Sequence, residues 1–234
     1  MLLAALLALL CASASASASA AAVPSQVTAE YAVIHTGLTI GRITESFNRK
    51  GDLYTAQSVT RSEGPLKVIL DDQITLESSG RVGASGLQPL EFAQRRAKDS
   101  KRDLKTSFDW DKGTVSTLLH GEKSQVPLPP DTQDRLSAMY QFLHLASYGP
   151  TLAMPMTSVR RVEQFNYRLV EEGKVSTPGG EFDTLHYTRV TTKPSDTKVD
   201  VWLAKDHHKF PVRVIFDDPK GVRLEQVLVS LTAN

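Results

Sequence analysis

The feature that most constrains the fold is a period-two alternation of apolar and polar residues, repeated along most of the chain. The alternating runs are rich in Val, Ile, Thr, Tyr and Phe, and Gly, Pro, Asn and Asp separate them at spacings typical of antiparallel meanders. Clear examples are Val199–Leu203 and Val212–Phe216. The pattern predicts a mainly β protein: a strongly curved antiparallel sheet or incomplete β-barrel of about ten to eleven strands.

Turn signals mark where these strands reverse. Asp111-Lys112-Gly113 stands between two alternating runs and predicts a hairpin, because Gly adopts positive φ without a steric penalty. Further turns are expected at Lys50–Asp52, Glu172-Gly173 and Pro178–Gly180. Leu66–Leu70 fits a short helix or a strand equally well.

One helix is expected in the middle of the chain, from Asp131 to Ser147, closing one opening of the barrel. Asp131 stands where an N-cap belongs, and Asp134 in the first turn favours the positive end of a helix. Gly149-Pro150 ends the helical pattern. The spacing places four apolar residues on one face: Leu136, Met139, Tyr140 and Leu143.

This apolar face has two interpretations. It packs in the core, or it forms a lid over an apolar cavity to which Met154 and Met156 add adaptable contacts. Trp110 and Trp202 either line such a cavity or fill the core. The candidate ligand-binding residues are therefore Trp110, Leu136, Met139, Tyr140, Leu143, Met154 and Trp202.

The N-terminal segment, residues 1–22, predicts export. It contains no charged side chain and runs from an apolar block, Leu2–Leu10, into an Ala/Ser tract typical of a cleaved signal peptide. The block is shorter than the roughly 20 residues of a membrane anchor. The sole Cys, Cys11, follows Leu10, which is unlike the small residue that lipoprotein processing requires. We therefore expect residues 23–234 to form a single, thiol-free, β-rich domain in the periplasm.

The charge balance limits the partners. The chain has 27 Lys and Arg against 26 Asp and Glu, a formal net charge of +1, so no strong field attracts nucleic acid or an anionic membrane. No segment beyond residue 22 has the apolar length of a membrane span. The stretch Arg95–Lys105 is dense in charges of both signs. It predicts a solvated face or loop, and its net positive sum could contact a polyanion.

Residues that might carry chemistry are few. His207-His208 lies beside Asp206, but adjacent strand residues point to opposite faces, so a solvated turn is the simpler interpretation. Asp109 and Asp111 could share a face as a catalytic carboxylate pair, although a hairpin turn accounts for both. The sequence therefore leads us to expect no cofactor, no metal site and no enzymatic activity.

Several blocks in fixed order resemble the bacterial exported proteins grouped as domain of unknown function 3108. The early blocks are Tyr31, Gly37 with Gly41-Arg42, Tyr54, Gly86-Leu87-Gln88-Pro89 before Phe92, and Phe108-Asp109. The later ones are Pro127 with Pro130-Asp131, Leu136–Tyr140, Thr177–Phe182, Val201–Asp206 and Phe210–Arg213. The most specific are Thr177–Phe182 and the final block, Val201–Asp206 before Phe210–Arg213.

The resemblance implies an envelope protein of Gram-negative bacteria, with a β-rich fold similar to the open barrels of periplasmic lipoprotein carriers. It supplies no catalytic residues. With the export signal it favours a non-enzymatic protein that binds a lipid, an acyl chain or a lipoprotein in a half-open barrel. The alternatives are an interaction module that pairs with an envelope protein through an exposed strand edge, and an enzyme that uses Asp109 and Asp111 on a polysaccharide.

Overall fold

The computed structural model of the protein describes residues 23–64 and 73–234. Over these residues fourteen antiparallel strands form one sheet, in the order β8-β7-β6-β5-β4-β3-β2-β1-β14-β13-β12-β11-β10-β9. The strands are β1 Gln26–His35, β2 Leu38–Lys50, β3 Leu53–Ser62, β4 Gln73–Gly83, β5 Gly86–Arg96, β6 Leu104–Asp109, β7 Thr114–Leu119, β8 Glu122–Pro127, β9 Thr151–Thr157, β10 Val162–Thr177, β11 Gly180–Arg189, β12 Lys198–Ala204, β13 Pro211–Asp217 and β14 Arg223–Ala233. The helical elements are η1 Ser100–Arg102, α2 Ser137–Gln141 and η2 Phe142–His144. The expected signal peptide and Leu66–Leu70 lie outside the described residues.

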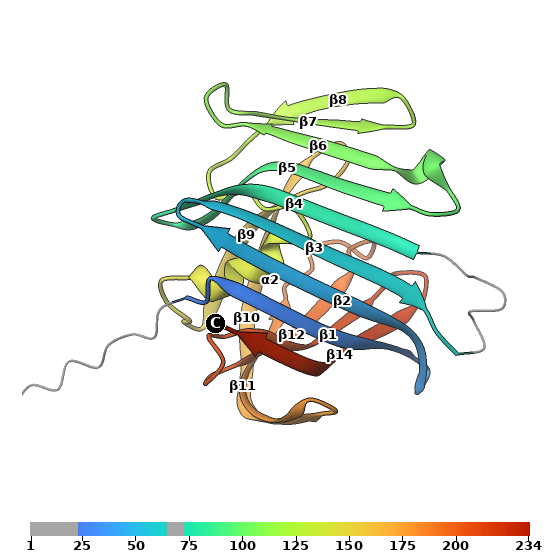
Figure 1. The fold of residues 1–234 in the computed structure, drawn as a ribbon, viewed down its shortest axis with the longest axis vertical. Helices are drawn as coiled ribbons and strands as arrows, with labels where there is room; N and C mark the ends of the chain where they lie inside the picture. Colours follow the sequence, from blue (N-terminus) through green and yellow to red (C-terminus); the bar gives the residue numbers. More distant parts are fainter. Residues whose placement is uncertain (1–22, 65–72) are drawn as a thin grey trace, which may run out of the picture.

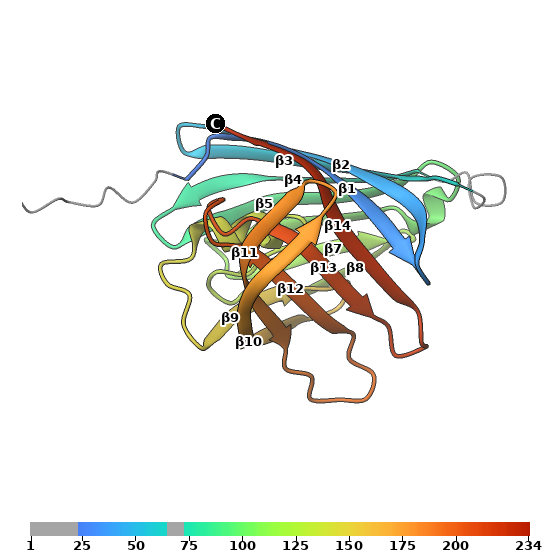
Figure 2. The ribbon, with the colours of Figure 1, turned by 90° about the horizontal axis from the view of Figure 1, so that it is seen from below.

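The sheet consists of two meanders, β1–β8 and β9–β14, that are joined where β1 pairs with β14. In Figure 1 the first meander faces the viewer and β9–β12 lie behind it. Seen from below in Figure 2, the second meander folds under the first. The terminal strands of the sheet, β8 and β9, are not paired with each other within the described chain. The sheet is therefore an open barrel.

The mainly β, unclosed antiparallel fold confirms the predicted class, but the predicted number of strands is wrong. β8 escapes the alternation pattern because its sequence, EKSQVP, is polar on both faces. β9 contains Pro155, which an edge strand tolerates because one side of it donates no ladder bonds. The predicted turn at Glu172-Gly173 is also wrong, since β10 runs through it with a register shift between Leu169 and Glu171.

The mid-chain helix exists but is much shorter than predicted. Asp131 has φ 59°, a left-handed conformation, and Gln133 forms a parallel bridge with Met156, so the chain remains irregular until α2 begins at Ser137. Leu145 is extended, with φ −65° and ψ 134°, and ends the helical segment after η2. The prediction failed because Asp134, not Asp131, supplies the capping oxygen.

The helical segment lies between the two meanders and is buried on both sides (Figures 1 and 2). One side joins a cluster built mainly on β1–β7, and the other joins a cluster built on β9–β13. The first cluster takes Leu136, Tyr140 and Leu143, and the second takes Ala138 and Phe142. Met139 packs against both. Apolar side chains on both sides of the segment are buried, and its polar residues Ser137 and Gln141 are buried too, so this segment fills the interior of the open barrel.

Candidate functional site

Side-chain hydrogen bonds hold the helical segment against the start of β5. The amide of Gln141 accepts from the backbone N–H of Leu87 at 2.7 Å and donates to the carbonyl of Ser85 at 2.9 Å. Gln133 Nε2 donates to the carbonyl of Leu87 at 2.8 Å. A Cβ on Gly86, which has φ 112°, would lie 2.4 Å from Gln141 Oε1, so glycine permits the close approach.

Asp134 organises the start of α2. Its Oδ1 accepts from the backbone N–H groups of Leu136 at 2.8 Å and Ser137 at 2.9 Å. Its Oδ2 accepts from Ser78 Oγ at 2.7 Å, and Tyr54 Oη lies 3.0 Å from the same hydroxyl. Burial raises the pKa of Asp134, while these hydrogen bonds oppose the rise. The carboxylate thus caps the helix and ties it to β4.

A second carboxyl group, Glu45 on β2, is buried beneath α2 with 4% of its surface exposed. Tyr140 Oη donates to Glu45 Oε2 over 3.4 Å, and Ser58 also bonds the carboxyl group. Burial raises the pKa of Glu45 to about 7, against the lowering effect of these two hydroxyls. Near neutral pH the interior therefore holds a proton that an exposed Glu would have lost.

The candidate ligand-binding residues of the helical segment are packed in the core. Leu136, Tyr140 and Leu143 contact the first cluster, Met139 contacts both clusters, and Met154 belongs to the second. Their contacts are with other side chains of the protein.

The two tryptophans lie apart. Trp110 donates from Nε1 to the carbonyl of Pro89 at 2.6 Å and stacks on Phe108. Trp202 stacks on His186, with 4.0 Å between ring centroids, and the guanidinium of Arg213 lies 4.8 Å from the centroid of the Trp202 ring. Both tryptophans are partly buried and pack against the first cluster, which also contains the helical residues Leu136, Tyr140 and Leu143.

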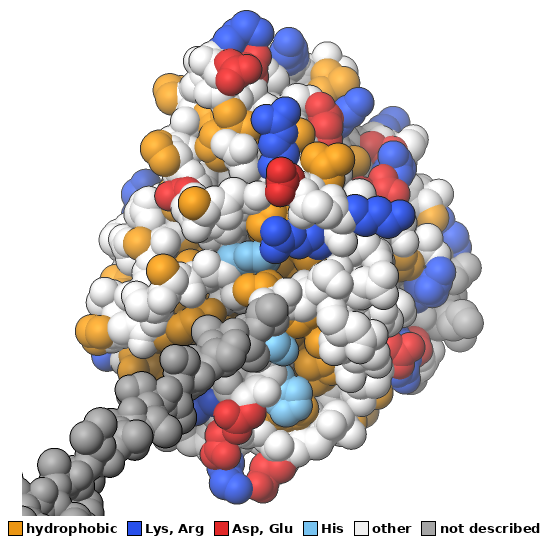
Figure 3. All heavy atoms as spheres, turned by 60° about the vertical axis from the view of Figure 1, so that its left-hand side comes forward, with side chains coloured by type: hydrophobic (Ala, Val, Ile, Leu, Met, Phe, Trp, Pro, Cys, Tyr) orange, Lys and Arg blue, Asp and Glu red, His pale blue; other side chains and the backbone are white. Residues whose placement is uncertain are grey.

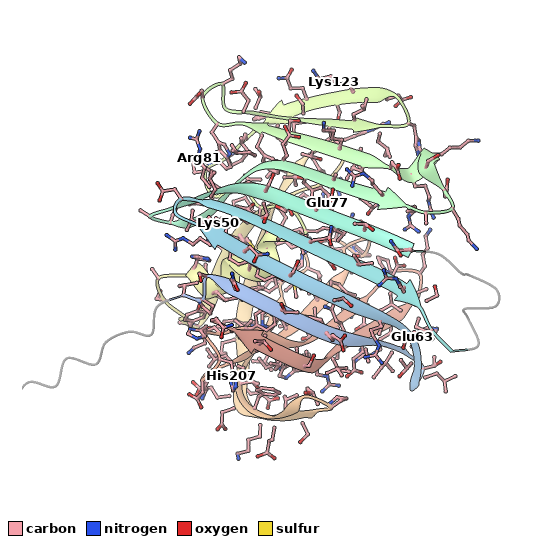
Figure 4. The ribbon with its side chains drawn as sticks, viewed as in Figure 1. Lys50, Glu63, Glu77, Arg81, Lys123 and His207 are labelled. Carbon is pink, nitrogen blue, oxygen red and sulfur yellow. The ribbon has the colours of Figure 1, made fainter. Side chains whose placement is uncertain are left out.

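Trp110 borders a groove of about 750 Å³ on the outer face of β5–β8. The face is identified by alternation, because Lys105, Ser107 and Asp109 line the groove while the intervening Thr106 is buried and does not line it. Figure 4 shows Arg81 and Lys123, which also line it, on β4 and β8. The surface is mixed in charge, as is the face seen in Figure 3.

Asp109, which also lines this groove, has a turn-stabilising role. Its carboxylate accepts from the backbone N–H of Lys112 at 3.0 Å and from Lys112 Nζ at 2.6 Å. These bonds hold the pKa of Asp109 below its usual range, so Asp109 is a poor proton donor. Together with Gly113, at φ 63°, they form the predicted hairpin turn.

A different pocket, of about 300 Å³, opens on the inner face where β5 and β7 end and β6 begins. These strand ends lie at the right of Figure 1. Its floor is a row across three strands, since Gln94 pairs with Leu104 and Leu104 with Leu119. The neighbouring row, Phe92, Thr106 and Thr117, is buried. The pocket therefore begins where the packed core ends.

Three arginines line this inner pocket: Arg96 at the end of β5, Arg102 in η1 and Arg135 just before α2. Arg135 Nη1 donates to Gln94 Oε1 at 3.0 Å, and Gln94 Nε2 donates to the carbonyl of Arg102 at 3.2 Å. Burial lowers the pKa of Arg135 and the charge of Arg96 lowers it further, against the opposing charge of Asp134. Arg102 and Arg135 are nevertheless exposed to solvent, and Arg102 pairs with Asp99 at 3.7 Å.

Sequence reasoning did not identify this arginine pocket. The only signal was the charge-dense stretch Arg95–Lys105, which was given an outer face or loop as its main interpretation. Two other lining residues, Arg135 and Val159, come from segments 30 or more residues away in the sequence. Only the tertiary fold brings them to Arg96 and Arg102.

His207, one of the two adjacent histidines, packs edge-on against Phe182, with 5.1 Å between ring centroids. Within residues 23–64 and 73–234, no three His, Cys, Asp or Glu side chains are grouped so as to hold a metal ion. No helix in the same part of the chain is long and apolar enough to cross a membrane.

Comparison with protein families gives one match. The model described as "Protein of unknown function (DUF3108)" matches residues 27–227. The chain belongs to this family. No curated protein matches the chain.

Among solved structures, the chain is similar to a β-barrel-like protein of domain of unknown function DUF1849 from Brucella abortus. The TM-score is 0.60 at 14% identity, over 91% of this chain and 99% of that one. This likeness concerns the fold alone.

A lower TM-score, 0.38 at 9% identity, relates 89% of the chain to 96% of a protein from Bacteroides fragilis, described provisionally as exported, with a YmcC-like fold. The chain is also similar to a domain from Vibrio parahaemolyticus that is described provisionally as an outer membrane lipoprotein-sorting protein domain. The TM-score is 0.32 at 10% identity, over 89% of this chain and 85% of that one.

The blocks that carry the DUF3108 resemblance meet around α2. Leu87 from one block binds the side chain of Gln141, directly after another block. Tyr31 Oη donates to the carbonyl of Pro211 at 2.8 Å, and the ring of Phe210 lies between those of Tyr31 and Tyr140, 6.3 and 6.2 Å away. These residues therefore hold the helical segment inside the sheet.

Proposed function

We propose that the protein is a non-enzymatic component of the bacterial envelope that binds an amphipathic envelope molecule, a lipid or an acyl chain. The observation that carries the proposal is the helical segment 136–144, which packs apolar side chains against both walls of an unclosed sheet. Most of these contacts are apolar, so an acyl chain can replace them at little cost in dispersion energy, although the bonds of Tyr140 to Glu45 and of Gln141 to β5 would have to break. The uncharged Leu/Ala N-terminus supports export to the envelope.

In this proposal the ligand competes with the helical segment for the two apolar walls. The bonds of Gln141 to Ser85 and Leu87 favour the helix-bound state. A ligand that binds only the displaced state shifts the population toward it, and weaker helix attachment raises its apparent affinity.

The test combines native mass spectrometry with a binding titration. Protein purified from its own envelope is expected to carry a reproducible mass excess that fragments as a lipid. Gln141→Ala is expected to bind a neutral acyl probe, dodecanol, about five- to thirtyfold more tightly than wild type, as a loss of 1–2 kcal/mol in helix attachment predicts. The matched control is Gln125→Ala, since Gln125 lies on the outer face and bonds only Thr114. No mass excess and no dodecanol binding in any variant would refute the proposal.

A second candidate is an interaction module that docks an envelope protein through a strand edge. The observation in its favour is β8, an edge strand whose ladder partner is β7. The β9 edge is less open, because Gln133 exchanges backbone hydrogen bonds with Pro155 and Thr157. Recovery of a stoichiometric protein partner without lipid, from envelope extracts, would favour docking over lipid binding.

A further inference from the structure

One side chain on the inner wall beneath α2, Glu45 on β2, is a hydrogen-bond acceptor in largely apolar surroundings. It is 4% exposed, and its cross-strand neighbours are Ala29 on β1 and Ser58 on β3. From the helical segment, Tyr140 Oη reaches it at 3.4 Å. We infer that the interior binds an amphipathic molecule whose polar end is an uncharged hydrogen-bond donor, a hydroxyl or an amide N–H, and that Glu45 accepts this bond. The inference rests on the proposed function and names the polar chemistry of its ligand.

The first argument is the way in which Tyr140 fills this place. Its ring stacks on Phe47, with 4.7 Å between ring centroids, and lies 6.2 Å from the ring of Phe210. Its hydroxyl donates to Glu45, and the whole residue is 1% exposed. The position therefore accommodates an apolar body that ends in a hydrogen-bond donor. A ligand that displaces the helical segment enters the space that Tyr140 leaves, so the same complementarity applies to it.

The second argument is the fate of the buried carboxyl groups when the helical segment leaves the wall. Within the described chain, the buried side chains that carry a carboxyl group are Glu45 and Asp134. Asp134 keeps its backbone N–H donors at the start of α2, because they are its near neighbours in sequence. Glu45 loses Tyr140, and Ser58 is the donor that remains. A ligand without a donor would leave a buried acceptor incompletely bonded, and sites of this kind discriminate strongly against such ligands.

The third argument is the sign of the charge in the interior. No Lys, Arg or His is buried among residues 23–64 and 73–234. Burial raises the pKa of Glu45 to about 7, and the groups that oppose the rise are the hydroxyls of Ser58 and Tyr140. An anionic head group would therefore meet a second acid and no buried cation. Because two acids that share an apolar site cannot both ionise without a large cost, a phosphate or carboxylate head group is disfavoured.

The experiment is isothermal titration at pH 8 with three dodecyl probes, each below its solubility limit: dodecanol, its methyl ether and dodecanoate. The ether has the same chain as dodecanol but no hydrogen-bond donor, and dodecanoate carries a negative charge. Wild type is expected to bind dodecanol about fivefold or more tightly than the ether, as an unmet buried acceptor predicts. It is expected to bind dodecanol at least about tenfold more tightly than dodecanoate.

The first variant is Glu45→Leu, which removes the acceptor. The ratio of the dodecanol affinity to the ether affinity is expected to fall to about one. This ratio is the informative quantity, because weaker attachment of the helical segment raises both affinities together.

Two further variants separate the acceptor from the attachment of the helix. Tyr140→Phe removes the donor of the helical segment and keeps Glu45, so both affinities should rise while their ratio stays as in wild type. Glu45→Gln keeps an oxygen acceptor and loses the charge. It should keep the ratio and narrow the gap between dodecanol and dodecanoate at least about threefold.

The matched control is Glu77→Leu. Glu77 lies on β4 and pairs with Arg95 at 2.6 Å on the outer face, so its loss leaves all three affinities unchanged. Circular dichroism and thermal unfolding check that each variant is folded.

The outcomes separate the two claims. Equal binding of dodecanol and the ether by wild type, or a ratio in Glu45→Leu as high as in wild type, would overturn the role of Glu45 and leave lipid binding intact. Wild-type binding of dodecanoate as tight as that of dodecanol would also overturn the inference, because the interior would then not exclude an anion. If none of the three probes binds any variant, the proposed function itself fails.

Discussion

Strand β5 connects two regions of opposite character. At its start, Leu87 forms hydrogen bonds with Gln141 of the helical segment and with Gln133 just before it. At its end, Gln94 and Arg96 border an open pocket that Arg102 and Arg135 also line. One strand therefore carries a buried attachment at one end and a charged, open margin at the other.

The difference has a physical meaning. Buried polar groups with matched partners stabilise a unique packing, because leaving any one of them unmet costs about 1–3 kcal/mol. Exposed cations at the edge of a core contribute much less, because solvent screens their charges. The predictions below test whether substitutions at the two ends differ in size.

The largest expected loss of stability is in the filled interior, and it should exceed the loss from the same substitution at the pocket floor. Leu136→Ala should reduce the free energy of unfolding by about 2–5 kcal/mol, because Leu136 is 1% exposed and its removal leaves a cavity. Leu119→Ala should cost about 1 kcal/mol, since Leu119 is only half-buried. Urea unfolding followed by circular dichroism measures both, and equal losses would erase the distinction.

Because Glu45 is buried beneath α2, the free energy of unfolding should depend on pH. Its pKa rises from 4.5 to about 7 on burial, so between these values the native state keeps a proton that the unfolded state releases. Stability should therefore fall as pH rises through this window, by up to about 3 kcal/mol. Glu45→Gln removes the titration, and at pH 8 it should be more stable than wild type by about that amount, relative to their difference at pH 4.

Urea unfolding of both proteins at pH 4, 6 and 8 measures this effect. Glu77→Gln, on the exposed face of β4, is the control. Parallel stability profiles for wild type and Glu45→Gln would contradict the assignment of a buried, protonated carboxyl group.

The same contrast explains what the sequence could predict. Alternation identified strands such as Lys198–Ala204 because one face is buried and the other is not. It missed β8, whose pairing comes from its neighbour β7 and not from its own residues. The apolar face of the helix was found from its spacing, but Ala138 and Phe142 on the opposite side show that the segment is enclosed, which the pattern alone did not reveal.

The arginine pocket lay beyond sequence reasoning for a related reason. A charge-dense segment predicts a solvated surface, and that holds for Arg95. Its neighbour Arg96 lies on the inner face because successive strand residues alternate between the two faces. Arg135 lies in the irregular segment before α2, which has no periodic pattern that would place it beside Arg96. Pockets built from loop residues depend on tertiary contacts.

The attachment of the helical segment gives the third prediction. Gln141→Ala should cost about 2 kcal/mol, because it leaves the buried N–H of Leu87 without its acceptor. Gln125→Ala, on the outer face, should change stability by less than about 0.5 kcal/mol. Thermal and urea unfolding measure the pair. A negligible loss for Gln141→Ala would mean that the helix is held by apolar packing alone.

The smallest expected effect lies at the other end of β5. Arg135→Gln removes an exposed cation whose attraction to Asp134 exceeds its repulsion by Arg96, so at low ionic strength it should lower the free energy of unfolding by about 0.5 kcal/mol or less. Salt at 0.5 M should screen these charges and abolish the loss. Arg95→Gln breaks the exposed ion pair with Glu77 and should give a loss of similar size that salt also removes. A loss above about 1 kcal/mol in Arg135→Gln that persists in high salt would mean that Arg135 serves the fold through its bond to Gln94, and both ends of β5 would then attach the helical segment by matched hydrogen bonds.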